Sequence, residues 1–209
     1  MTDHFNNEQE KFWAGDFGDM YIERNQGAEL HASKLNIFSD ILSRTRNVGS
    51  VLELGGNIGM NIKAINCLLP NAKTSAVEIN ARAYEQLKEV CTGQAYLTSI
   101  LDMQSNVQQS FDFVFTQTVL IHINPNDLQS VYEMMYKYSR RYICVTEYYN
   151  PTPVEIVYRG ETGKLFKRNF AGEILDKYPD LELVDYGFKY IRDPNFIQDD
   201  LTWFLLQKR

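Results

Sequence analysis

The sequence predicts an α/β protein with a mostly parallel sheet and helices on both of its faces. Segment 51–54 is an apolar strand that leads into a glycine-rich turn, and helical spacing begins at Ile58. Apolar strands and amphipathic helical segments then alternate four to five times along the chain. Segments 181–190 and 200–207 are expected to be two strands with no helix between them, which indicates an antiparallel pair at one sheet edge.

Hydrophobic periodicity locates each element. The expected helices cover 28–45, 58–69, 81–90, the segment after Asp127 and 169–178, and the remaining strands cover 74–79, 95–100, 111–116 and 141–146. Segment 150–168 shows no regular period and is expected to be a loop. We predict one domain over residues 1–209, with an N-terminal cap or lid at 1–45, a core at 46–209 and an acceptor loop at 150–169.

Composition limits the classes of partner. A net charge of -6 and a pI near 5.1 argue against nucleic acid, because phosphate binding needs a concentrated basic face. No apolar run reaches the roughly 18 residues of a membrane span. Residues 1–11 are polar and acidic, unlike a targeting peptide. The three cysteines are isolated and show no metal-binding spacing. We therefore expect a cytoplasmic protein that acts on a small molecule, without a metal site.

The glycine-rich turn contains an acidic residue in the pattern Glu53-x-Gly55-Gly56-Asn57-x-Gly59. Glycine reaches positive φ and lets a ligand approach the backbone, and the following helix start offers free N–H groups. A carboxylate at this position would repel a pyrophosphate and attract an ammonium group. The segment resembles motif I, E/D-x-G-x-G-x-G, of the class I methyltransferases that use S-adenosylmethionine (SAM). Asn57 replaces the middle glycine, and Asn tolerates left-handed backbone.

Polar groups follow the ends of the first four strands, where ligands bind in open α/β sheets. They are Glu53, Glu78, Asp102, and the pair Gln117 and Thr118. The resemblance implies that Glu53 faces the amino group of SAM, Glu78 the ribose hydroxyls and Asp102 the adenine amino group. With SAM as cofactor and S-adenosylhomocysteine (SAH) as product, the expected cofactor-binding residues are Tyr21, Glu53, Gly55, Gly56, Asn57, Gly59, Glu78, Ile79, Asp102 and Gln117.

The resemblance extends over nearly the whole chain. The class I methyltransferases have a Rossmann-like seven-stranded sheet of order 3-2-1-4-5-7-6, with strand 7 antiparallel, and the two closing strands fit it. More closely, the chain is similar to a family of small bacterial methylases associated with pseudaminic acid biosynthesis. The segments that carry this similarity are 12–25, 118–125, 147–153, 158–160, 163–168 and 193–196.

Candidate catalytic and acceptor-binding residues follow the fourth and fifth strands. His122 or Glu147 could take the proton that an alcohol or amine acceptor loses. His122 could equally be a packed loop histidine. Four basic residues, Arg159, Lys164, Lys167 and Arg168, could hold a carboxylate or phosphate of the acceptor, or could simply be solvated. Trp13 and Tyr148 are expected to shape the acceptor pocket.

The sequence thus predicts methyl transfer from SAM to an oxygen or nitrogen of a small, anionic acceptor. A nucleotide sugar or a nonulosonic-acid intermediate fits that description. One alternative is a methyltransferase-like protein that binds SAM without turnover. The other is an NAD-dependent oxidoreductase, against which the missing G-x-G-x-x-G spacing counts. The acceptor and the oligomeric state stay open.

Overall fold

The computed structural model describes residues 5–209, so the first four residues of the predicted cap lie outside the described chain. Seven strands form one sheet in the order β3-β2-β1-β4-β5-β9-β8. The first five are parallel, and β9 runs antiparallel to both of its neighbours. Their bounds are β1 Ser50–Leu54, β2 Lys73–Glu78, β3 Ala95–Leu97, β4 Phe111–Gln117, β5 Ser139–Glu147, β8 Leu181–Lys189 and β9 Leu201–Lys208.

The strand numbering differs from the predicted order because of one insertion. The predicted acceptor loop is instead an antiparallel hairpin of β6, Val154–Tyr158, and β7, Glu161–Lys167, outside the main sheet. The last two sheet strands are therefore the eighth and ninth of the chain. Arg159 and Gly160, with φ of 53° and 89°, form the turn. Positive φ at both turn residues matches the twist of a hairpin. β6 is mostly exposed and β7 mostly half-buried, so burial did not impose the alternation that reveals a strand.

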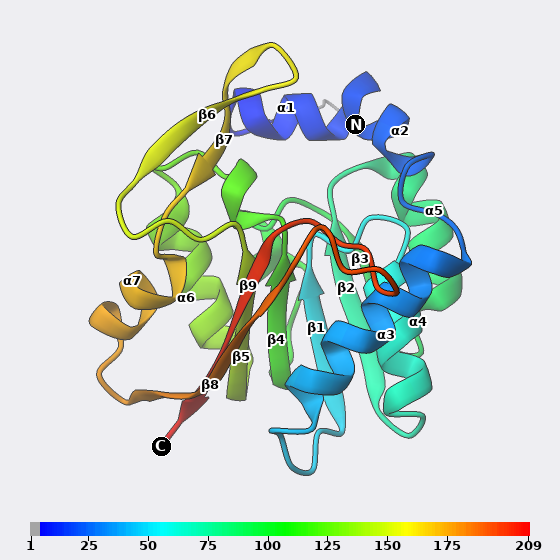
Figure 1. Ribbon diagram of the computed structural model, residues 1–209, viewed down its shortest axis with the longest axis vertical. Coiled ribbons are helices and arrows are strands. Elements are labelled where there is room, and N and C mark those ends of the chain that lie inside the picture. Colours follow the sequence, from blue (N-terminus) through cyan, green and yellow to red (C-terminus); the bar gives the residue numbers. More distant parts are fainter. Residues whose placement is uncertain (1–4) are drawn as a thin grey trace.

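Helices cover both faces of the sheet (Figure 1). α3, Ala28–Leu42, and α4, Met60–Leu68, share one apolar cluster with β1, β4, β5 and β9. α5, Ala81–Val90, packs beside α4 on that same face. α6, Leu128–Tyr138, and α7, Phe170–Lys177, belong to the cluster on the opposite face. Large side chains such as Phe38 and Phe113 are fully buried in the cluster beneath α3 and α4, and each such burial contributes roughly 2 kcal/mol. No helix within residues 5–209 is long and apolar enough to cross a membrane.

A roof lies above the carboxyl ends of the parallel strands (Figure 1). It consists of α1, Glu8–Ala14, and α2, Asp16–Ile22, together with the β6–β7 hairpin. The amide of Gln9 donates to the carbonyl of Gly163 at 2.9 Å, and the Phe17 ring meets the Tyr158 ring at 6.0 Å. Two short 3-10 helices, Met103–Ser105 and Leu120–His122, lie in the loops that follow β3 and β4.

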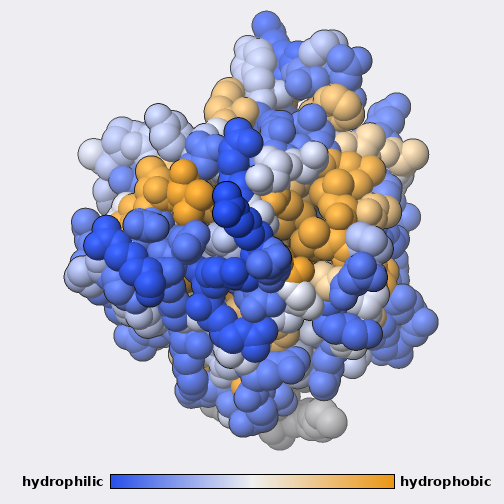
Figure 2. Space-filling model, turned by 90° about the horizontal axis from the view of Figure 1, so that it is seen from below, coloured by the Kyte–Doolittle hydropathy of each residue, from blue (hydrophilic) through white to orange (hydrophobic). Residues whose placement is uncertain are grey.

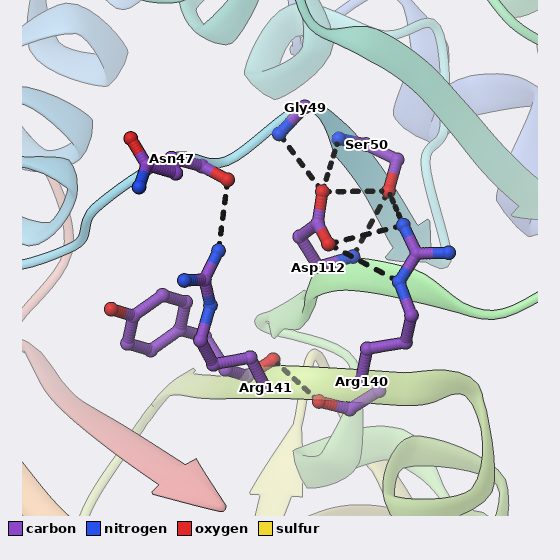
Figure 3. A network of polar contacts seen from close by, with 8 residues as sticks. Asn47, Gly49, Ser50, Asp112, Arg140 and Arg141 are labelled. Atoms are coloured by element: carbon purple, nitrogen blue, oxygen red, sulfur yellow. Dashed lines mark hydrogen bonds and ion pairs between the residues drawn. The ribbon is translucent and has the colours of Figure 1, made fainter.

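A dense polar network closes the opposite, amino end of the sheet (Figure 3). Asp112 of β4 accepts hydrogen bonds from the N–H groups of Gly49 and Ser50 at 2.9 and 3.0 Å. Arg140 of β5 binds the same carboxylate at 3.0 Å and the Ser50 hydroxyl at 2.8 Å. Figure 2 looks onto the molecule from this side, and hydrophilic side chains run across its middle between hydrophobic areas. The network joins three neighbouring strands at the end of the sheet away from the roof.

Candidate active site

A cavity of about 160 Å³ lies between the roof and the carboxyl ends of β1, β2 and β4. Most of the residues predicted to bind a ligand meet there. Those that line the cavity are Trp13, Tyr21, Glu53, Gly55, Gly56, Asn57, Glu78, Ile79, Gln117 and His122. The other predicted residues are not among the described residues that line the cavity. They are Gly59, Asp102, Glu147, Tyr148, Arg159, Lys164, Lys167 and Arg168.

The glycine-rich turn has the backbone that its sequence predicts. Gly55, Asn57 and Gly59 have φ of 78°, 45° and 84°. A Cβ at position 55 would lie 2.6 Å from Cγ2 of Val119, so the chain needs a glycine there for space as well as for conformation. Asn57 adopts the left-handed conformation that we expected of it, and its side chain accepts a bond from the N–H of Ile58 at 2.7 Å. Gly59 begins α4 instead of lining the cavity.

Glu53 is the most unusual group of the cavity. It is fully buried, and its Oε1 accepts a hydrogen bond from Nδ2 of Asn61 at 2.6 Å. Its Oε2 has no partner among the residues that the structure describes. Burial raises the pKa of the carboxyl to about 8, although Asn61 and the cation of Lys34 lower it. A buried oxygen without a partner, facing a cavity, is an acceptor available to a ligand.

Glu78 is held rigidly at the end of β2. Its two oxygens accept the N–H groups of Asn80 and Asn57, each at 2.7 Å. Burial raises the pKa of this carboxyl, and the backbone bonds oppose the rise. Each oxygen keeps a further lone pair, so a carboxylate in this orientation can still accept bonds from two neighbouring hydroxyls. The Asn80 amide also donates to Asp19 of the roof at 2.8 Å, which ties α2 to this strand end.

The end of the cavity beside β3 differs from the prediction. Asp102 accepts a bond from Nδ2 of Asn6 at 2.8 Å and does not reach the lining. Ser99, Ile100 and Leu101 form that wall instead. The Ser99 hydroxyl donates to the buried Glu10 of α1, so the roof also holds this loop. The wall is mainly apolar and suits a flat heterocycle.

His122 lies at the roof side of the cavity and is almost fully buried. Its Nδ1 is 2.6 Å from the carbonyl oxygen of Lys164. Because a carbonyl only accepts, Nδ1 carries the proton and Nε2 keeps a free lone pair. Burial lowers the pKa of the imidazole to about 4, so the ring is neutral near pH 7. The rings of Trp13 and Tyr158 flank it at 4.6 and 5.2 Å.

Glu147 does not reach the cavity. Its Oε1 accepts the N–H groups of Val119 and Leu120, both at 3.1 Å, and the side chain is buried. Burial raises the pKa of this carboxyl to about 7, and these backbone bonds oppose the rise. The geometry therefore contradicts the predicted contact with an acceptor. Glu147 instead holds the loop that carries His122.

The four basic residues of the predicted acceptor loop are dispersed along the hairpin. Arg168 forms an ion pair with Glu173 at 2.7 Å, and the Lys164 ammonium lies over the Phe12 ring at 5.0 Å. Lys167 lies over the ring of Tyr148, whose hydroxyl donates to Asp199 at 2.6 Å. The guanidinium of Arg159 lies over Tyr158 at 5.6 Å and forms no ion pair with residues 5–209. They do not form one anion-binding cluster.

Lys34 and Asn61 line the cavity beside Glu53 but were not among the predicted site residues. Burial lowers the pKa of Lys34 to about 8, while the charges of Glu53 and Asp199 raise it. A signal was present in the sequence, because Lys34 stands between Leu30 and Phe38 on the apolar stripe of α3. A cation on such a stripe requires a function or a partner.

Comparison with known proteins identifies the fold. The sequence matches no protein-family model and no curated protein sequence. Solved structures do match, and several of them are SAM-dependent methyltransferases. The magnesium protoporphyrin IX methyltransferase of Synechocystis, solved with bound SAM, aligns over 100% of both chains with a TM-score of 0.68 and 8% identity.

Two further structures agree. The plantazolicin methyltransferase BpumL, in complex with SAH, aligns over 96% of this chain and 94% of its own, with a TM-score of 0.67 and 14% identity. A SAM-dependent methyltransferase of Leishmania major aligns over 95% and 81%, with a TM-score of 0.69 and 14% identity. The chain thus has the α/β fold of SAM-dependent methyltransferases.

Proposed function

We propose that the protein is a SAM-dependent methyltransferase that acts on an oxygen or nitrogen atom of a small polar acceptor. The observation that carries the proposal is the fully buried carboxylate of Glu53, which has one oxygen without a partner in the described chain and faces the cavity. A buried carboxylate is ionised at low cost only beside a cation. The amino group of SAM is such a cation.

The remaining lining supports the same cofactor. Glu78 offers acceptors to the ribose hydroxyls, and the wall of Ile79, Ile100 and Leu101 suits the adenine ring. When bound, SAM supplies a methyl group on a positively charged sulfur, which makes that methyl open to attack by a nucleophile. The protein then has to orient the acceptor and remove its proton.

His122 is our candidate for the proton acceptor. Its neutral ring presents Nε2 while the Lys164 carbonyl holds Nδ1, so the tautomer and the ring orientation are both set. The aromatic rings of Trp13 and Tyr21, whose centroids lie 5.3 Å apart, line the same cavity. In this role Nε2 would accept the proton that the acceptor hydroxyl or amine loses on methylation, a displacement in which the methyl–sulfur bond of SAM breaks and SAH leaves.

We further infer an anionic acceptor, such as a nucleotide sugar or a nonulosonic-acid intermediate. The similarity to methylases associated with pseudaminic acid biosynthesis motivates this inference, and Arg159 supports it. Its guanidinium has no carboxylate partner in residues 5–209, and it lies over Tyr158, which contacts His122. An acidic group bound by Arg159 would leave a hydroxyl or amine of the same molecule close to His122.

Two measurements test the proposal. Calorimetric titration should give SAH binding, whereas NADH should not bind. Mass spectrometry should then detect the gain of one methyl group in a panel of nucleotide sugars, nonulosonic acids and amino sugars incubated with SAM. Absence of SAH binding would reject the methyltransferase. Binding without a methylated product from any O or N acceptor would favour a SAM-binding protein without turnover.

Arg159→Gln tests the acceptor class. We expect a KM several-fold higher for acidic acceptors and unchanged for their neutral analogues, since one charge-assisted contact is lost. Arg209→Gln is the matched control, because Arg209 does not line the cavity and forms an exposed ion pair with Glu182. Equal effects of Arg159→Gln on acidic and neutral acceptors would contradict an anion-binding role.

A further inference from the structure

The last strand of the sheet carries an exposed apolar surface that the cavity does not use. β8 ends the sheet beside β9, and no strand within residues 5–209 pairs with its outer edge (Figure 1). Six large apolar side chains between positions 183 and 191 are exposed, and none of them lines the cavity. They are Leu183, Val184, Tyr186, Phe188, Tyr190 and Ile191. Soluble monomers rarely expose such a surface on an unpaired edge strand, because it pairs readily with another strand.

The aromatic rings of this strand lie on one face of the sheet. Tyr186 is in register with Phe204 of β9, and their rings stack at 6.2 Å. Tyr186 and Phe188 are two positions apart, so their side chains project to the same face. α7 contacts β8 on the sheet, but Leu181 at the start of the strand is the only residue of β8 that is buried. The aromatic part of β8 is therefore not covered by a helix of the described chain.

Two charges are fixed on either side of Gly187 in the same strand. Asp185 forms an ion pair with Arg44 at 2.6 Å, and Lys189 forms one with Asp40 at 2.5 Å. The negative and the positive charge thus lie two residues before and two residues after the glycine. The register irregularity of β8 falls between Leu183 and Asp185, so segment 185–189 is regular and able to pair.

This segment is complementary to itself. When two copies of β8 pair antiparallel about Gly187, Asp185 of each copy faces Lys189 of the other. In the same register Tyr186 of each copy faces Phe188 of the other. Opposite charges and aromatic pairs directly across an antiparallel pair both stabilise it. The strand therefore supplies the charge and the apolar surface that its own partner requires.

We propose that β8 is a dimerisation surface and that its occupant is β8 of a second copy of this chain. The two strands pair antiparallel about Gly187, so the two seven-stranded sheets join into one. Such a contact has two-fold symmetry and uses the same residues on both copies. The cavity lies beyond the ends of β1, β2 and β4, away from this edge, so each copy keeps its own site. The inference does not depend on the proposed function.

Analytical ultracentrifugation from about 1 to about 100 μM tests the dimer. The wild type should sediment with twice the chain mass of 24.3 kDa. Phe188→Glu should raise the dissociation constant of the dimer about 100-fold or more, because it places an unpaired charge against Tyr186 of the other copy. Leu97→Glu is the matched control and should stay dimeric, because Leu97 is an exposed apolar residue of β3, the opposite edge strand.

Mixed disulfide formation tests the register. In a Cys67→Ser background, which removes an exposed free cysteine, one chain carries Tyr186→Cys and the other carries Phe188→Cys. Residues that face each other across an antiparallel pair lie close enough for a disulfide. The mixture should therefore form covalent dimers much faster than either variant alone.

Three outcomes would overturn the proposal. They are a wild type that stays monomeric over this concentration range, a folded Phe188→Glu variant that is as dimeric as the wild type, and cysteine variants that cross-link no faster together than alone. Thermal unfolding shows whether each variant is folded. None of these measurements involves SAH, so the proposed function stands or fails separately.

Discussion

The carboxylates at the two ends of the parallel strands lie in opposite surroundings. At the amino end, Asp112 has N–H, hydroxyl and guanidinium donors around it, and these lower its pKa although burial alone would raise it. At the carboxyl end, Glu53 is more deeply buried, has one oxygen without a partner in the described chain, and has a raised pKa. The first arrangement stabilises the fold. The second lowers stability, and under the proposed function the ammonium group of the bound cofactor offsets that loss.

The largest expected effect concerns His122. His122→Gln should lower kcat by about 10²- to 10⁴-fold, the usual contribution of a general base, without changing the Kd for SAH. Steady-state kinetics with the acceptor found by mass spectrometry, together with calorimetry, measure both quantities. His31→Gln is the control, because His31 does not line the cavity. A wild-type kcat in the His122→Gln variant would show that His122 is not the general base.

Glu53→Gln should act in opposite directions on binding and stability. The loss of the carboxylate should weaken SAH binding about 10- to 100-fold. The ligand-free protein should become more stable at pH 7 by about 1–3 kcal/mol, because a carboxyl with a raised folded-state pKa destabilises the fold above its unfolded-state pKa. That penalty grows as pH rises from the ordinary glutamate pKa towards about 8. Urea unfolding of the ligand-free protein at pH 4 and pH 7 measures the penalty. A Glu53→Gln variant that is less stable than the wild type would contradict a destabilising role of the Glu53 carboxylate.

Asp112→Asn should have the opposite effects to Glu53→Gln, with lower stability and no change in SAH binding. We expect a loss of about 1–3 kcal/mol at pH 7 with SAH affinity unchanged, because donors at the amino end lose their charged partner. Since the pKa of Asp112 is lowered in the folded state, its contribution is present above the ordinary aspartate pKa and is lost as pH falls through the folded value. Urea unfolding across pH 2–7 measures this. Glu182→Gln removes an exposed ion pair and is the control.

The smallest effect is a pH dependence of SAH affinity. Below about pH 8 the carboxyl group of Glu53 must lose a proton before it can bind an ammonium group. SAH affinity should therefore fall by up to about tenfold for each pH unit below about pH 8. Lys34 and Glu78 also act on this carboxyl group. Glu53→Gln should flatten this dependence. A profile that Glu53→Gln leaves unchanged would show that another group titrates.

Sequence patterns predicted the sheet well, because each buried strand is a short apolar run that can be recognised from neighbouring residues alone. The apolar run before Gly55 and the acidic residues at the ends of β1 and β2 follow from the spacing of residues within short segments. The hairpin of β6 and β7 was predicted wrongly as a loop, because exposed strands pair without an apolar period. Glu147 was expected beside the acceptor, but its oxygens bind backbone N–H groups that no spacing could anticipate.

The sequence by itself determined the order in which the sheet strands follow one another along the chain, the glycine turn and the carboxylates at the strand ends, because these depend on residues close together in the chain. Only the tertiary structure decided which side chains share the cavity. Lys34 of α3 and Glu53 of β1 line the same cavity, and Nδ1 of His122 binds the carbonyl oxygen of Lys164, 42 residues further along the chain. Such contacts depend on how helices and loops dock onto the sheet, which is set by packing of the whole core.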